Sequence, residues 1–285
     1  MKLQNECLPC ALNSLVENLN KTKIDNNKKK HIISDFLKYL ADVDYSISPP
    51  ELGRYLHNLI KHKVENTDPF KEEKIFYNHH LYEKYDYFKN IILTSINPFF
   101  MAVKMSIVGN IIDFGTNNKF DLNTIGNLIE SSEITIDKSE QLKEEIGKAN
   151  LILYLGDNAG EIVFDKLLIE YIKNHYSNKE IYFAVREKPI INDITKEDAD
   201  FVGMSDFAEV ISNGYDIPGT SIEKSSPQFL RIYNSADLII SKGQGNFETL
   251  DEESKNIFFL LMAKCDLVAN YFNVQKGSLI VAKKR

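Results

Sequence analysis

Hydrophobic residues in the first part of the chain recur every three or four positions, which is the spacing of one helix face. Two such stripes lie within residues 12–19 and 32–40, and a third follows Ser48-Pro49-Pro50-Glu51, a sequence typical of a helix start. Asn97-Pro98 opens a further helix, which Gly115 is expected to close. The first half of the chain is therefore predicted to be helical.

The second half has a different pattern, in which short, continuous apolar runs alternate with helical stripes. The runs are Asn150–Leu155, Glu180–Val185, Glu209–Ile211, Ala236–Ser241, Ile257–Met262 and Leu279–Ala282. Strands that are buried on both faces and alternate with helices form a parallel sheet covered by helices. The change of pattern predicts a boundary between Phe120 and Ala149.

The composition excludes several classes of protein. The 285 residues are 43% hydrophobic and 26% charged, so the chain is long and apolar enough for a sizeable core. A formal net charge of −7 argues against a nucleic-acid partner. Three cysteines do not build a disulfide framework, and no apolar run approaches a membrane span or a secretory segment. We therefore expect a globular cytoplasmic protein with no membrane association.

Polar and glycine-rich residues follow three of the predicted strands. These turns are Gly156–Glu161, Arg186–Asp193 and Lys242–Glu248. In parallel α/β sheets, ligands bind beyond the carboxyl ends of the strands. The three turns are therefore the candidate site.

Asp157, Asn158 and Asp193 supply the chemistry of a hard-metal site. Their carboxylate and amide oxygens suit Mg²⁺ or Mn²⁺ better than zinc. Two carboxylates would neutralise a divalent ion and leave it electrophilic toward phosphate oxygens. The alternative for Asp157-Asn158 is a helix cap, because both residue types satisfy the first amides of a helix.

Lys242, together with the Gly243 and Gly245 amides, is a candidate phosphate site at an adjacent strand end. Two familiar nucleotide sites are excluded, because the chain carries neither a Gly-x-Gly-x-x-Gly after the first predicted strand nor a P-loop. Aspartyl-nucleophile phosphatases of the haloacid dehalogenase type need a second Asp two residues after the first. Ala159 stands there, so that mechanism is not indicated.

Several of these segments resemble the signatures of one family, the metal-dependent damage-control phosphatases. The matching segments are Gly156–Asp165, Pro189–Asp193 and Lys242–Glu248, with Gly109–Gly115 and Cys7-x-x-Cys10 similar to its prokaryotic branch. The resemblance covers almost the whole chain. It implies an all-helical N-terminal domain, for which we expect residues 1–135, and a Rossmann-like three-layer α/β/α domain over residues 136–285.

The resemblance also implies a metal-dependent phosphatase acting on small phosphorylated metabolites, often sugar phosphates. The family coordinates its metal through the positions that match Asp157, Asn158 and Asp193. We expect Mg²⁺ or Mn²⁺ there, with Co²⁺ and Ni²⁺ as further candidates, and Lys242 as the fourth catalytic residue. The nucleophile would be either a water on the ion or Asp157 itself, and the residues leave both open.

Further residues are candidates for substrate contact. They are Asn110, Asp113, Glu161, Arg186, Gly243 and Asn246. With Ser106, the first two form a polar line on an otherwise apolar helix, which faces either a cleft or solvent. Arg186 either clamps a phosphate or pairs with Glu187 or Asp198. Glu161 lies where a first helical turn favours a carboxylate, and a role in positioning water is the alternative.

Cys7 and Cys10 lie one helical turn apart and are either a buried reduced pair or part of a metal or redox site. Two thiolates are only half of a zinc site, and Cys265 is expected in the core. Two other classes of function therefore stay open. One is a phospho-metabolite-binding protein without turnover, and the other is a metal or redox interaction protein centred on Cys7 and Cys10.

Overall fold

The structure is a computed structural model that describes residues 1–109 and 122–284. Asn110, Asp113 and the expected helix end at Gly115 lie outside the described residues. Within them, no helix combines the length and apolarity that a membrane span requires.

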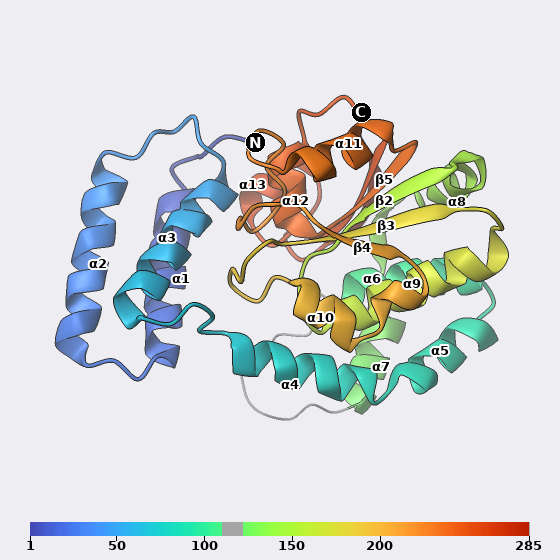
Figure 1. Ribbon diagram of the computed structural model, residues 1–285, viewed down its shortest axis with the longest axis horizontal. Helices are drawn as coiled ribbons and strands as arrows, with labels where there is room; N and C mark the ends of the chain where they lie inside the picture. The colour runs from blue at the N-terminus through green and yellow to red at the C-terminus, as the bar shows by residue number, and fades with distance from the viewer. Residues whose placement is uncertain (110–121, 285) are drawn as a thin grey trace.

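A seven-stranded sheet forms the centre of the molecule (Figure 1). Its strands are β1 (Ile134–Asp137), β2 (Leu151–Leu155), β3 (Glu180–Val185), β4 (Glu209–Ser212), β5 (Leu238–Lys242), β6 (Ile257–Met262) and β7 (Leu279–Lys283). The strand order is β1-β7-β6-β5-β2-β3-β4, and only the β6–β7 pair is antiparallel. The mostly parallel sheet is therefore confirmed, with each of the six predicted runs as a strand.

Helices precede the sheet and alternate with its strands. They are α1 (Cys7–Lys21), α2 (Asn26–Ala41), α3 (Pro49–Val64), α4 (Lys71–Tyr82), α5 (Tyr85–Thr94), α6 (Pro98–Val108), α7 (Leu122–Ser131), α8 (Ser139–Lys148), α9 (Glu161–His175), α10 (Lys196–Phe201), α11 (Pro227–Ser235), α12 (Gly243–Leu250) and α13 (Asp266–Phe272), with a 3₁₀ turn at Met204–Asp206. Helices α6, α8 and α9 share a core with one face of the sheet, and α11, α12 and α13 share a core with the other. The three-layer α/β/α architecture is confirmed.

The predicted helix starts in the first half are also confirmed. Ser48 and Glu51 form a capping box at the start of α3. The Asn97 side chain accepts a hydrogen bond from the Phe100 amide, and Pro98 occupies the first turn of α6, where its missing N–H is not needed. Local side-chain chemistry therefore sets these two boundaries.

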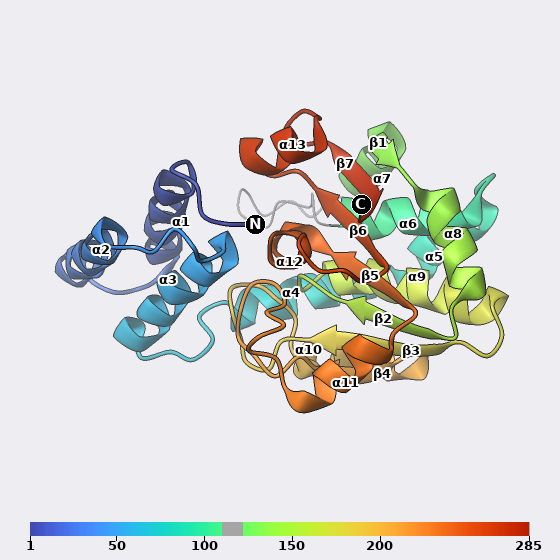
Figure 2. The same cartoon turned by 90° about the horizontal axis from the view of Figure 1, so that it is seen from above.

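The helices of the first half divide into two groups. Helices α1, α2 and α3 pack around a core of their own and stand apart from the sheet in both views (Figures 1 and 2). Helices α4, α5 and α6 instead contribute Leu81, Phe88 and Phe99 to the core beneath the sheet. The expected domain boundary at 135/136 falls inside β1, and the division into two domains stays a prediction.

Strand order decides where the three polar turns lie. β5, β2 and β3 are neighbours and run parallel, so their carboxyl ends lie side by side at one edge of the sheet. The turns that begin at Gly156, Arg186 and Gly243 leave from those ends. The sequence-predicted candidate site is thereby assembled in one place.

Candidate metal centre

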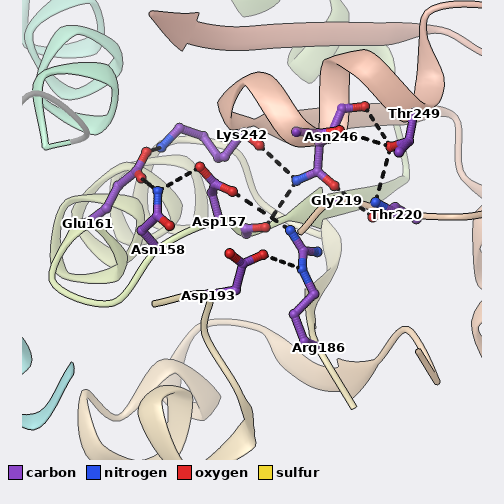
Figure 3. A network of polar contacts seen from close by, with 12 residues as sticks. Asp157, Asn158, Glu161, Arg186, Asp193, Gly219, Thr220, Lys242, Asn246 and Thr249 are labelled. Atoms are coloured by element: carbon purple, nitrogen blue, oxygen red, sulfur yellow. Dashed lines mark hydrogen bonds and ion pairs between the residues drawn. The ribbon is translucent and has the colours of Figure 1, made fainter. Parts of the chain in front are cut away.

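Backbone pairing between two turns brings the predicted metal ligands together. Asn158 and Asp193 form an isolated antiparallel bridge between the turn after β2 and the turn after β3. The Ala159 amide donates to the Asn192 carbonyl at 2.9 Å, and the Ile194 amide donates to the Asp157 carbonyl at 2.9 Å. Asp157, Asn158 and Asp193 therefore lie on adjoining backbone at the edge of the sheet (Figure 3).

The side chains of Asp157 and Asn158 are oriented by contacts among themselves and with Glu161. The Asn158 amide Nδ2 donates to Asp157 Oδ2 at 2.8 Å and to Glu161 Oε2 at 3.4 Å. Because both bonds use the nitrogen, the Asn158 Oδ1 atom is the end of the amide that a metal can take. All three side chains are buried.

The ion pairs of Arg186 within the described residues are with Asp193 and Asp157, not with the expected Glu187 or Asp198, because the turn after β3 folds back onto the arginine. Arg186 is almost completely buried, at 1% exposure. Its Nε donates to Asp193 Oδ2 at 2.7 Å, and its Nη2 lies 3.8 Å from Asp157 Oδ1 (Figure 3). Among the described residues, Nη2 has no hydrogen-bond partner. A buried guanidinium nitrogen in this state is a ready donor for an anionic ligand.

The Asp193 carboxyl has a pKa raised to about 7, because burial disfavours its charged form more strongly than Arg186 favours it. The nearby Asp157 carboxylate raises this pKa further. A positive charge placed between the two aspartates would relieve both effects.

Lys242 lies close to the predicted metal ligands, against Glu161, and is fully buried. Its Nζ donates to the Ser106 carbonyl at 2.6 Å, to Asp165 Oδ1 at 2.7 Å and to Glu161 Oε1. Burial lowers the pKa of this ammonium, but the Asp165 and Glu161 carboxylates outweigh that effect and raise it to about 12. Lys242 is thus a charged support under the site, and its expected direct contact with phosphate stays a prediction.

The charges of the buried groups fit a divalent cation. Among the described residues, four carboxylates, those of Asp157, Glu161, Asp165 and Asp193, are buried here against two cationic side chains, Arg186 and Lys242. Burial also raises the pKa of Glu161 and Asp165, while Lys242 opposes that shift. With all four carboxylates ionised, the formal excess is two negative charges around hard oxygen donors. A bound Mg²⁺ or Mn²⁺ would offset these charges and favour the ionised forms.

The turn after β5 is joined to the turn after β2 by the side chain of Asn246. Asn246 is buried and uses its Nδ2 to bind the carbonyls of Lys242 (2.7 Å) and Gly156 (3.1 Å), which ties the end of β5 to the end of β2. Its Oδ1 accepts from the Thr220 hydroxyl at 2.8 Å. Asn246 therefore joins two strand ends by hydrogen bonds in this structure. Its expected contact with substrate stays a prediction.

Gly243 lies directly against the Asp157 carboxylate. Its φ is +77°, and a Cβ added there would lie 2.0 Å from Asp157 Oδ2. A glycine is thus required both by the backbone conformation and by the close approach. Gly243 therefore lies beside one of the predicted metal ligands. Its expected contact with substrate stays a prediction.

The polar line predicted on α6 is described only at its first member. The Ser106 side chain is fully buried and donates to the Val103 carbonyl at 2.8 Å, while its own carbonyl receives the Lys242 ammonium. Ser106 therefore faces the protein interior rather than solvent. Asn110 and Asp113 lie outside the described residues, and their contact with substrate stays a prediction.

Two residues of the network were missed by sequence reasoning. Asp165 binds Lys242 and the Tyr154 hydroxyl, and its spacing of four residues from Glu161 was a signal that both carboxylates share one face of α9. Asn78 in α4 accepts a hydrogen bond from the Gly160 amide at 2.6 Å. The sequence carries no signal for this second contact, which spans 82 residues.

All three cysteines are reduced, with Cys7 and Cys265 half-buried and Cys10 exposed. Burial raises the pKa of the Cys7 and Cys10 thiols, and the charges of Cys265 and Glu248 raise both further. Within the described part of the chain, no three His, Cys, Asp or Glu side chains are arranged to hold one ion. A metal or redox role for Cys7 and Cys10 stays a prediction.

The chain is similar to known proteins along almost its whole length. Residues 3–280 match a model described as the damage-control phosphatase ARMT1-like domain. A damage-control phosphatase of Pyrococcus horikoshii is 38% identical over 288 residues, covering 100% of this chain and 99% of the relative. One from Archaeoglobus fulgidus is 32% identical over 289 residues, covering 98% of each chain.

The fold agrees as well. A crystal structure of a DUF89 family protein from Pyrococcus horikoshii matches with a TM-score of 0.91 and 36% identity, covering 100% of both chains. The resemblance carried by the motifs at the three turns is thereby confirmed along the whole chain. The chain belongs to the damage-control phosphatase family.

Proposed function

We propose that this protein is a metal-dependent phosphatase that hydrolyses small phosphorylated metabolites, including sugar phosphates. Membership in the damage-control phosphatase family supports phosphatase activity on damaged metabolites. One observation carries the metal dependence: the paired turns bring Asp157, Asn158 and Asp193 together in a buried cluster with an excess of negative charge.

The residues at this edge of the sheet have separate roles in the proposed reaction. Asp157, Asn158 and Asp193 would hold a divalent ion, which supplies Lewis-acid polarisation of a phosphoryl oxygen when bound. Arg186 keeps Asp193 in place through Nε and presents Nη2 to the phosphoryl group. The charge that develops on the equatorial oxygens is thus met by a donor that is already in position.

Lys242 and Glu161 act through Asn158 in this proposal. Lys242 fixes the Glu161 carboxylate, and Glu161 accepts from the Asn158 Nδ2 atom. The amide oxygen of Asn158 is thereby turned toward the ion. Such supporting contacts set the orientation of metal ligands and their affinity.

The activity is tested by measuring phosphate release from a panel of sugar phosphates and p-nitrophenyl phosphate with Mg²⁺, Mn²⁺, Co²⁺ or Ni²⁺. We expect release that requires metal and is lost on chelation. A matched acidic control is Glu180→Ala, since Glu180 is exposed at the opposite end of β3 and should leave activity unchanged. Binding of these compounds without hydrolysis under any metal would refute the enzyme and leave a binding protein.

A further inference from the structure

Asn78 connects α4 to the turn after β2 and to α10, although α4 lies far from both in the sequence. Its side chain is only 2% exposed. The Oδ1 atom accepts from the Gly160 amide at 2.6 Å, and the Nδ2 atom donates to Asp198 Oδ1 at 2.8 Å. A single amide group therefore bridges the turn after β2 and the segment that follows the turn after β3.

The first of these bonds fixes the turn that carries two of the proposed ligands. Gly160 immediately precedes α9 and has a φ of +75°. The first amides of a helix have no partner within the helix, so a side chain, water or ligand must satisfy them. Asn78 satisfies the Gly160 amide two residues after Asn158, which holds the turn against α4 and occupies that donor.

The second bond fixes the segment after Asp193. Asp198 Oδ2 accepts from both the amide (2.8 Å) and the hydroxyl (2.9 Å) of Thr195, which caps α10. Thr195 in turn forms a backbone bridge with Arg186, the residue that holds Asp193. Through Asp198, Asn78 is thus connected to the arginine of the site.

We propose that Asn78 is a positioning residue that sets the spacing of the metal ligands on the two turns. The proposal rests on the proposed function, because it assigns Asn78 a role at the metal centre described above. Asn78 is not one of the proposed metal ligands and acts through its hydrogen bonds with Gly160 and Asp198. The competing view is a buried polar contact that stabilises the fold and leaves the metal centre as it is.

The first test is Asn78→Ala, measured by Mn²⁺ binding in electron paramagnetic resonance. We expect Mn²⁺ affinity to fall about tenfold, as for loss of a contact that orients metal ligands, and the Gly160 amide to lose its protection in hydrogen exchange. The matched control is Asn90→Ala, which makes the same change on the exposed side of α5. A folded Asn78→Ala protein with unchanged Mn²⁺ affinity would overturn the proposal.

A rescue experiment separates positioning from general stability. Asn78→Asp keeps the acceptor for the Gly160 amide but places a carboxylate against Asp198, so Mn²⁺ affinity should fall. Adding Asp198→Asn restores a donor–acceptor pair and should return the affinity to near the wild-type value. A merely structural contact would instead lower the melting temperature of Asn78→Asp and leave its Mn²⁺ affinity at the wild-type value.

The proposal and the proposed function fail in different ways. A wild-type protein that binds no Mn²⁺ and releases no phosphate refutes the proposed function. A wild-type protein that does both, with Asn78 variants of unaltered affinity and Gly160 protection, refutes only the role of Asn78.

Discussion

At the scale of single residues, Gly243 shapes the candidate metal centre because it has no side chain. Gly243 leaves β5 with a positive φ and packs its backbone against the Asp157 carboxylate. The carboxylate is therefore confined on one side by backbone and on the other by Asn158. Little freedom is left for Asp157 to move away from the position in which we propose that it binds a metal.

Gly243→Ala should abolish most Mn²⁺ binding, because the new Cβ would occupy the position of the Asp157 carboxylate. We expect affinity to fall at least about tenfold, in addition to about 1–3 kcal/mol of backbone strain. Gly277→Ala is the matched control, since Gly277 has a φ of +91° and nothing within 4 Å of an added Cβ. Titration of Mn²⁺ into both variants checks this, and equal affinities would show that Gly243 does not confine Asp157.

Lys242→Met should destabilise the folded protein by about 3–5 kcal/mol, because it leaves the Glu161 and Asp165 carboxylates buried without their cation. Denaturant unfolding of the variant measures this, with the exposed Lys276→Met as control. A variant of unchanged stability whose turnover is lost would instead favour direct contact of Lys242 with phosphate.

At the scale of secondary-structure elements, periodicity predicted most of the fold. Six of seven strands appear as short apolar runs in the sequence. The central strands β2, β5 and β6 are buried on both faces, whereas β4, at the edge of the sheet, is only partly buried. β1 was missed because it has only four residues, which alternate between half-buried and exposed. Such a short edge strand is defined by its pairing with β7, which lies more than 140 residues later and leaves no local trace.

The helix α3 also carries a pH-sensitive group, His57. Its ring is buried and packs edge-on against Phe70, with ring centroids 5.8 Å apart. Burial, together with the nearby charge of Lys61, lowers the pKa of His57 from 6.5 to about 3. Below pH 6.5 the unfolded chain therefore binds a proton that the folded chain does not.

Folding stability should accordingly decrease as pH falls from 6.5 toward 3, by up to about 1.4 kcal/mol per pH unit from this one group. His57→Gln should remove that part of the acid sensitivity, while His62→Gln at the exposed end of α3 should not. Unfolding measured at pH 6.5 and at about pH 5 tests this. An unchanged pH dependence in His57→Gln would contradict it.

At the scale of the whole molecule, the place of the site could be predicted and its internal contacts could not. The rule that parallel strands present ligands at their carboxyl ends located Asp157, Asn158 and Asp193 together, and the strand order agrees. Whether Lys242 faces a cleft or buried carboxylates depends on how α9 packs beneath β5. That packing is a tertiary property with no signal in the sequence around Lys242.

For the helices that precede the sheet, too, the sequence predicted the elements but not their packing. Their stripes predicted helices, but a stripe does not say which surface it covers. Helices α4, α5 and α6 share a core with α9 and the sheet, whereas α1, α2 and α3 form a separate core. The contact between Asn78 and Gly160 arises from this arrangement.

We propose that Asp157, Asn158 and Asp193 hold the ion on which phosphate release depends. The most direct test is the initial rate of phosphate release from a phosphomonoester, measured against Mn²⁺ concentration in wild type and in Asp157→Ala, Asn158→Ala and Asp193→Ala. We expect no release from either Asp→Ala protein even at saturating Mn²⁺, because each loses a charged ligand. Asn158→Ala should need more Mn²⁺ but reach a measurable rate, because it loses a neutral one. Near wild-type turnover in folded Asp157→Ala or Asp193→Ala at saturating Mn²⁺ would contradict the assignment.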